Sequence, residues 1–193
     1  MKRLIAFLFI TLLLPIFAAA EVINDEILSG EWYFGAKINE MELHATISDS
    51  GEICIKGTGD DKEIITSDLT YVYGDTVTHF TKSVVEGAII LYGKFPASDR
   101  IILLLPSSEN EYTVYSIYPR LCRLNNEQLT FLDSGNTYKY YFEKNKLFLT
   151  NFMQANSPYL RGILTQIYPG IVRYDIEDDG KTIFFIKPEL ISQ

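Results

Sequence analysis

The chain has 193 residues and a formal net charge of −8, with 25 acidic residues against 17 basic ones. An acidic surface repels phosphate backbones and anionic lipid headgroups, so the composition disfavours nucleic acid and charged membrane surfaces as main partners. The length suits one domain with a sizeable core.

The first 20 residues have the three parts of a secretory signal peptide. Lys2 and Arg3 form a positive start, residues 4–17 are almost entirely apolar, and residues 18–20 are alanines that suit signal peptidase. The alternative is an uncleaved anchor, but the apolar run is shorter than the roughly 20 residues that a bilayer span needs. We therefore expect cleavage after Ala20 and a secreted or periplasmic protein with no stable membrane span. Its net charge would be −10, with 15 basic and 25 acidic residues.

From residue 30 onward the chain alternates between short strands and turns. Leu43, Ala45 and Ile47 alternate with polar neighbours, which is typical of a half-buried strand, and Gly51 suits the positive φ of the turn that follows. The run Ile101–Leu105 has no polar alternation and should be covered on both faces. Further strands are expected at 63–73, 76–82, 88–95, 100–105, 111–118, 128–132, 138–143, 146–152, 171–177 and 182–187.

Residues 157–168 depart from this pattern. Ser157 and Pro158 are typical of a helix start, and Pro169-Gly170 ends the run. The apolar residues recur at helical spacing, at positions Leu160, Ile163, Leu164 and Ile167. The predicted fold is therefore all-β and mainly antiparallel: a meander β-barrel or barrel-like sheet with one short late α-helix. Residues 21–193 are expected to form a single domain.

Two cysteines, Cys54 and Cys122, would enter an oxidising compartment on export. A disulfide between them would close a long loop and stabilise the fold by roughly 4 kcal/mol through chain entropy. Spacing in the sequence does not show that their Cα atoms lie within bridging distance. Both alternatives, a disulfide between the two cysteines and two free thiols, stay open.

Gly30-Glu31-Trp32 resembles the G-x-W that begins the first strand of lipocalins and related calycin barrels. The order of hairpins, a late helix and a further strand is also similar to that family. The resemblance implies that Trp32 packs at one end of the barrel under a late basic residue, for which Arg173 is the first candidate and Arg161 the second. It also implies a small hydrophobic ligand inside the barrel.

Catalytic and metal chemistry have little support in the sequence. His44 and His79 lie on strand patterns, and His44 shares its face with polar residues, so it is expected on the solvated surface. No spacing is typical of a zinc site, a nucleophile elbow or a phosphate-binding loop. The acidic pairs Asp60-Asp61 and Asp178-Asp179 adjoin glycine in turns, where aspartate side chains commonly hydrogen-bond to the backbone. We expect no catalytic residue, no metal and no cofactor.

Tyrosines alternate on the predicted strands, notably Tyr71 with Tyr73 and Tyr138 with Tyr140. Tyrosine suits the wall of a pocket or an interface because it combines a large apolar face with one hydroxyl. Ordinary β-propensity enriches tyrosine as well. These four residues, with Arg173 as a partner for an anionic ligand, form the predicted ligand-binding set.

Two main functions follow from this pattern. The first is an exported binding protein that holds a small hydrophobic or amphipathic ligand in a β-barrel. The second is a β-domain of the cell envelope with a filled core, which binds another protein; an exported hydrolase is a distant third. A ligand-binding protein should have a cavity lined by inward aromatic side chains, whereas an interaction domain should have a packed interior and an exposed apolar patch.

Overall fold

The computed structural model describes residues 23–38, 42–57, 62–144, 146–150, 159–178 and 180–191. The predicted signal peptide and the pair Asp60-Asp61 lie outside these ranges. The described chain contains sixteen strands, a four-residue helix α1 (Asp25–Leu28) and a 3-10 turn η1 (Pro188–Leu190). Within these ranges we find no helix with the length and apolar character needed to cross a membrane.

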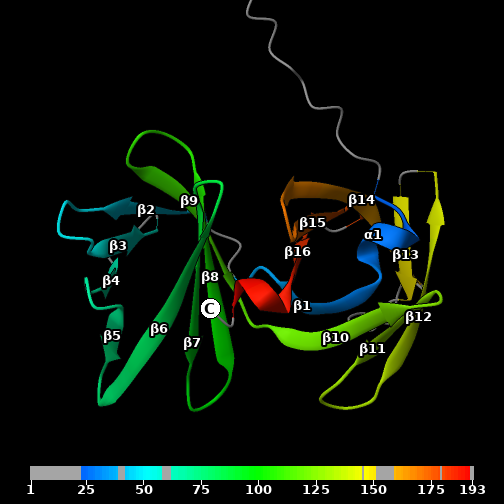
Figure 1. Ribbon diagram of the computed structural model, residues 1–193, viewed down its shortest axis with the longest axis horizontal. Helices are drawn as coiled ribbons and strands as arrows, with labels where there is room; N and C mark the ends of the chain where they lie inside the picture. Colours follow the sequence, from blue (N-terminus) through cyan, green and yellow to red (C-terminus); the bar gives the residue numbers. More distant parts are fainter. Residues whose placement is uncertain are drawn as a thin grey trace, which may run out of the picture.

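The strands close into two eight-stranded antiparallel barrels that lie side by side (Figure 1). Barrel A consists of β1 (Gly30–Ala36), β10 (Arg120–Asn125), β11 (Gln128–Phe131), β12 (Thr137–Glu143), β13 (Lys146–Thr150), β14 (Tyr159–Tyr168), β15 (Ile171–Ile176) and β16 (Thr182–Ile186). Barrel B consists of β2 (Leu43–Ile47), β3 (Ile53–Lys56), β4 (Lys62–Ile65), β5 (Thr70–Tyr73), β6 (Thr76–Val85), β7 (Ala88–Lys94), β8 (Asp99–Pro106) and β9 (Glu111–Ile117). The all-β antiparallel prediction is confirmed, but the sequence did not predict that the strands form two barrels.

Barrel B is inserted into barrel A between β1 and β10. These two strands pair directly, so the chain leaves barrel A and returns to it at neighbouring points. Lys37, just after β1, forms an isolated bridge with Ile117 at the end of β9. A Cβ on Gly35 would lie 2.6 Å from the Tyr118 carbonyl oxygen, so only glycine permits this close crossing.

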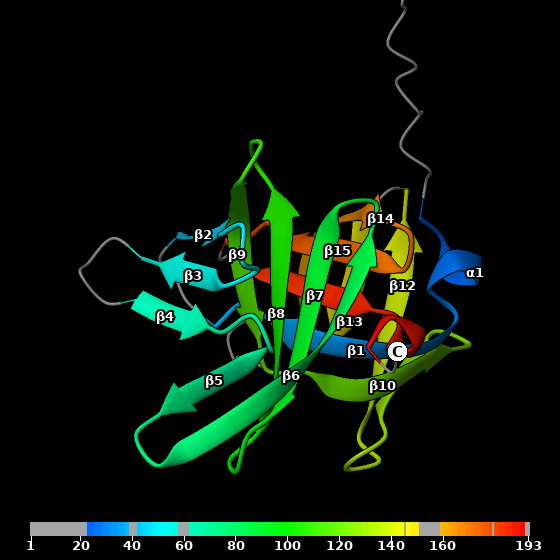
Figure 2. The ribbon, with the colours of Figure 1, turned by 60° about the vertical axis from the view of Figure 1, so that its left-hand side comes forward.

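A shared apolar cluster joins the two barrels, here called the inter-barrel core. Its buried members are Ile90, Ile101, Leu103, Ile117, Ile171, Phe184, Ile186 and Ile191. They come mainly from β7 and β8 on one side and from β15 and β16 on the other, and Figure 2 shows these strands facing one another. The prediction that the run Ile101–Leu105 is covered on both faces is confirmed. Ile102 and Leu104 face the interior of barrel B, whereas Ile101 and Leu103 lie in the inter-barrel core.

Each barrel also has its own core. Barrel A is filled by large side chains, among them Trp32, Phe34, Phe131, Tyr140, Tyr174 and Phe185. The core of barrel B is mostly aliphatic, with Ile65, Phe80, Leu91, Ile102, Leu104 and Val114 among its members. The large rings therefore occupy the space that a ligand would need inside barrel A.

The predicted late helix is wrong, because residues 159–168 form strand β14. Leu160 and Gly162 are buried and Leu164 packs against the core of barrel A, whereas Ile163 is exposed. This is a period of two, and Gly162 conceals it in the sequence because it has no apolar side chain to mark an inward position. A Cβ there would overlap the Asp175 carbonyl of the neighbouring strand.

The predicted strands agree with the structure elsewhere, with two differences. Residues 63–73 form two strands rather than one, because a turn at 66–69 places Leu69 at φ 61°. The sequence pattern around Cys122 predicted only the end of a strand, whereas the structure has the full strand β10 there. The predicted turn at Gly51 is confirmed, with φ of 89°, and the turn between β5 and β6 likewise has a glycine of positive φ, Gly74 at 57°.

Candidate functional site

An open pocket of about 560 Å³ lies at the end of barrel B where β4, β6 and β8 begin. Its aromatic walls are Tyr71, Tyr73, Phe95 and Tyr118. In the described chain, Ile65 with Tyr71 is the one registered pair between β4 and β5, and the two strands diverge from it (Figure 2). This divergence widens the mouth of barrel B.

A polar group forms one wall of the pocket. Arg100 donates from Nη2 to Glu63 Oε2 at 2.9 Å and from Nε to Ser116 Oγ at 2.7 Å. The Arg100 side chain is 15% exposed, so this ion pair is partly shielded from water. Each of the three residues lies two positions from an inward-facing apolar residue of its strand, which explains why all three point into the barrel mouth.

Aromatic rings connect the pocket to the core of barrel B. Tyr71 and Phe95 have ring centroids 6.2 Å apart, and Phe95 meets Phe80 of the core at 5.9 Å. Burial, with a smaller effect from the Glu63 carboxylate, raises the pKa of Tyr71. Tyr71 therefore carries a protonated hydroxyl at neutral pH.

Thr78 lies one inward position below the pocket. It follows Thr76 on the inward face of β6 and pairs across the ladder with Tyr71. Thr78 is 2% exposed, and its hydroxyl has no hydrogen-bond partner among the described residues. A buried hydroxyl without a partner is costly to the folded state.

The structure does not bring the five predicted ligand-binding residues together. Tyr71 and Tyr73 line the pocket of barrel B. Tyr138 packs on Phe131 and Tyr140 is buried, both in barrel A, and Tyr140 donates its hydroxyl to the Asp25 carboxylate.

Arg173 lies on the outside of barrel A, where its Nε donates to Asp175 Oδ2 at 2.8 Å. It alternates with the buried Val172 and Tyr174, so it faces away from the interior.

Sequence reasoning missed the polar residues of the pocket. Arg100 precedes an apolar run, and Glu63 lies near the start of another short strand. A charged residue at the inward position of a strand end was the available signal. It was not interpretable before the strands were assigned to a common barrel.

Trp32 is buried at the α1 end of barrel A. Its Nε1 donates to the Leu28 carbonyl at 2.7 Å, and its ring meets Phe185 edge-on at 6.3 Å. The basic side chain over the ring belongs to Lys187, whose Nζ lies 3.9 Å from the ring centroid. Arg161, like Arg173, is paired elsewhere, with Glu177 at 2.9 Å.

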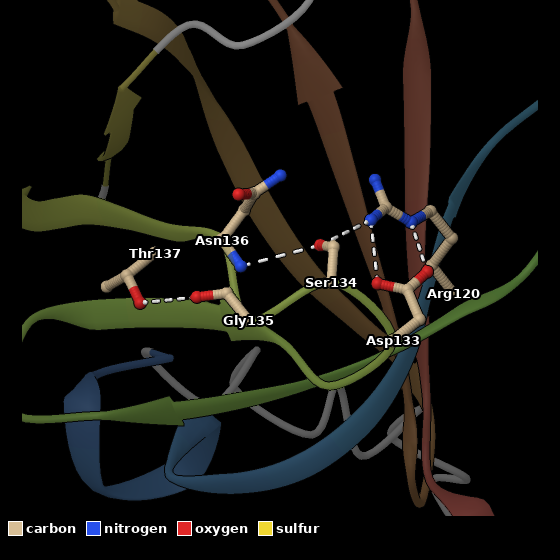
Figure 3. A network of polar contacts seen from close by, with 6 residues as sticks. All are labelled: Arg120, Asp133, Ser134, Gly135, Asn136 and Thr137. Carbon is tan, nitrogen blue, oxygen red and sulfur yellow. Dashed lines mark hydrogen bonds and ion pairs between the residues drawn. The ribbon is translucent and has the colours of Figure 1, made fainter.

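An arginine network covers the other end of barrel A (Figure 3). Arg120 donates from Nε and Nη2 to the two carboxylate oxygens of Asp133, at 2.9 and 2.8 Å, and from Nη2 to Ser134 Oγ at 3.1 Å. Its guanidinium lies 3.8 Å from the centroid of the buried Phe131 ring. The hydrogen bonds from Arg120 lower the pKa of Asp133 to about 2. We interpret this network as a structural cap.

The two cysteines are free thiols in different barrels. Cys54 is half-buried on β3 of barrel B, whereas Cys122 is buried in the core of barrel A. Burial raises the pKa of Cys122 to about 12. No bridge joins them in this structure.

The remaining titratable groups are dispersed. His44 is exposed on β2, as expected, and the exposed His79 meets the Thr70 hydroxyl at 3.0 Å through Nδ1. Across the described ranges, no group of three or more His, Cys, Asp or Glu side chains is arranged to hold a metal ion.

Comparisons with protein-family models, with curated proteins and with solved structures find no match to this chain. The fold therefore defines the class: a double antiparallel β-barrel with an open pocket at the mouth of barrel B.

Proposed function

We propose that this protein is an exported binding protein that holds a small amphipathic ligand at the mouth of barrel B. The pocket carries this proposal, because it combines four aromatic walls with one shielded polar group. Ligand sites are typically concave, mostly apolar and provided with a few oriented polar side chains. Barrel A, filled and covered at both ends, then serves as the rigid support.

The lipocalin resemblance supports the proposal in part. Barrel A has eight antiparallel strands, carries Trp32 near the start of its first strand, and places a late basic residue over the tryptophan ring. The insertion of barrel B and the strand at 159–168 differ from the chain order that the resemblance implies. The signal-peptide pattern of residues 1–20 supports export.

Binding to an envelope protein is the second candidate. The β5–β6 hairpin carries Val72 and Val77 as cross-strand neighbours, with 60% and 57% of their surfaces exposed. Exposed apolar pairs of this kind occur at protein interfaces. The packed core of barrel A also agrees with this candidate.

Titration of the exported chain with Nile red, an uncharged amphipathic dye, tests the proposal. We expect one-to-one binding with a negative heat-capacity change in calorimetry at two temperatures, and a higher melting temperature at saturation. Tyr71→Ala and Phe95→Ala should each weaken binding at least about tenfold, which corresponds to about 1.4 kcal/mol. Tyr141→Ala, on the outside of barrel A, is the matched control and should bind as the wild type does.

If neither Nile red nor a broad library of apolar compounds shifts the melting temperature, the small-ligand proposal is wrong. Loss of a protein partner on substitution of Val72 and Val77 by serine would then support the second candidate.

A further inference from the structure

We infer that the pocket of barrel B selects an uncharged ring bearing hydroxyl groups and discriminates against carboxylates. The inference rests on the proposed function and assigns the chemical class of its ligand. It follows from the charge balance, the hydrogen-bonding groups and the floor of the pocket.

The pocket is balanced in charge. Glu63 and Arg100 are its two charged lining residues among those described, and they pair at 2.9 Å. An entering carboxylate would lose hydration and meet a cation whose charge is already compensated. It would also repel Glu63 directly, and the partial burial of the pair strengthens that repulsion. The net charge of −8 on the whole chain also disfavours an anionic ligand.

The hydrogen-bonding groups favour a ligand that both donates and accepts. Arg100 uses Nε and Nη2 for its bonds, so Nη1 is a donor with no partner among the described residues. Thr76 and Ser98 are further polar lining residues, and the Glu63 carboxylate supplies an acceptor. A hydroxyl group matches such a mixed set, whereas a carboxylate only accepts.

The floor limits the ligand to a compact shape. Gly93 on β7 lies against the Phe80 ring, and a Cβ at Gly93 would come within 2.8 Å of that ring. Phe80 and Gly93 are cross-strand partners, so the Phe80 ring lies over β7 at the inner side of the pocket, where it meets the lining residue Phe95. A ring fits between this floor and the aromatic walls, but a long alkyl chain would have to displace buried core side chains.

Two compounds with the same fused ring test this selectivity, namely 1-naphthylmethanol, which is uncharged, and 1-naphthoate, which is anionic. Calorimetry with the wild-type exported chain at pH 7 should show at least about tenfold tighter binding of the alcohol. This comparison requires no substitution, so it does not depend on the folding of a variant.

Glu63→Gln should then raise the affinity for 1-naphthoate at least about tenfold, because Arg100 becomes an uncompensated cation. It should not raise the affinity for the alcohol, because the ligand hydroxyl loses its charged acceptor. The double substitution Glu63→Gln with Arg100→Gln should abolish the gain for 1-naphthoate. Glu31→Gln is the matched control, since it removes the same charge from an exposed ion pair with Arg123 on barrel A. It should leave both affinities unchanged.

The outcomes separate the inference from the proposed function. Equal binding of both compounds to the wild type, or an equal effect of Glu63→Gln and Glu31→Gln on 1-naphthoate binding, would overturn the inference alone. Binding of neither compound by a protein that still binds Nile red would also overturn the inference alone, whereas failure of Nile red and the apolar library to bind would overturn the proposed small-ligand function as well.

Discussion

Different side chains close the two ends of barrel A. Trp32 fills the α1 end and forms a buried hydrogen bond to Leu28, while Arg120 covers the opposite end over Phe131. Both ends combine a large apolar ring with a cation and satisfied polar groups. A change at the Trp32 end therefore removes packing and leaves the buried Leu28 carbonyl without its donor, whereas Asp133 at the Arg120 end is half exposed and stays hydrated.

Trp32→Ala should lower the free energy of unfolding by about 3–5 kcal/mol, because it removes a fully buried ring and leaves a cavity. Trp32→Phe should cost less, since it keeps part of the ring but leaves the Leu28 carbonyl without its donor. Urea denaturation followed by circular dichroism measures both changes. Tyr73→Ala, at an exposed site, is the control. A loss below about 1 kcal/mol for Trp32→Ala would show that Trp32 is not a core residue.

Cys122 gives barrel A a pH dependence in the alkaline range. Its pKa rises from 9.0 to about 12 because burial disfavours the thiolate. Below pH 9 the thiol is protonated in both the folded and the unfolded state, so its contribution to stability is complete. As pH rises from 9 toward 12, the unfolded state ionises first, and this contribution is lost.

The free energy of unfolding of Cys122→Ala should therefore fall less than that of the wild type between pH 9 and pH 11, in urea melts at matched ionic strength. Leu124→Ala, another truncation in the same core, provides a control without a titratable group. The same pH slope in Cys122→Ala and Leu124→Ala would contradict the prediction.

At the scale of single elements, β14 shows why apolar spacing alone is ambiguous. Leu160 and Leu164 are four residues apart, which suits one helix face and also one strand face. The neighbours Ile163 and Leu164 distinguish the two structures. They lie on the same side of a helix, but they point to opposite faces of a strand.

Leu164→Lys should destabilise the protein by about 2 kcal/mol or more, because it places a charge against the core of barrel A. Ile163→Lys should change stability by less than about 1 kcal/mol, since Ile163 is 40% exposed and lies opposite Asp175 on β15. Thermal melts of both variants measure the difference. Equal destabilisation by the two substitutions would argue for a helix at this position.

For the whole molecule, the inter-barrel core determines whether the two barrels act as one unit. Its side chains come from both barrels, and Ser83 of β6 donates to the Leu190 carbonyl of η1 across the same boundary. The insertion of barrel B also makes closure of barrel A depend on the pairing of β1 with β10. Both features favour cooperative unfolding of a single domain.

We expect tryptophan fluorescence and far-ultraviolet circular dichroism to report the same unfolding midpoint in urea. Trp32 is the only tryptophan and reports on barrel A, whereas circular dichroism reports on both barrels. Phe184→Ala should cost about 3–5 kcal/mol and separate the two transitions, because Phe184 is buried in the inter-barrel core against Tyr115.

Phe34→Ala, within the interior of barrel A, is the control and should lower stability while keeping the midpoints coincident. Separate midpoints in the wild type would mean that the two barrels unfold independently.

The sequence by itself determined most of the local structure of this protein, with β14 as the main exception. Alternation at Leu43, Ala45 and Ile47 and the glycine turns predicted the strands, because side-chain direction and positive φ are local properties. The apolar run at Ile101–Leu105 likewise predicted burial on both faces. Only the tertiary structure decided which strands share a barrel, since closure depends on pairs such as β1 with β10 that lie far apart in the chain. The same long-range pairing brought Glu63, Arg100 and Ser116 to one barrel mouth and separated Tyr71 from Tyr138, because a site is assembled by contacts whose register the local pattern does not encode.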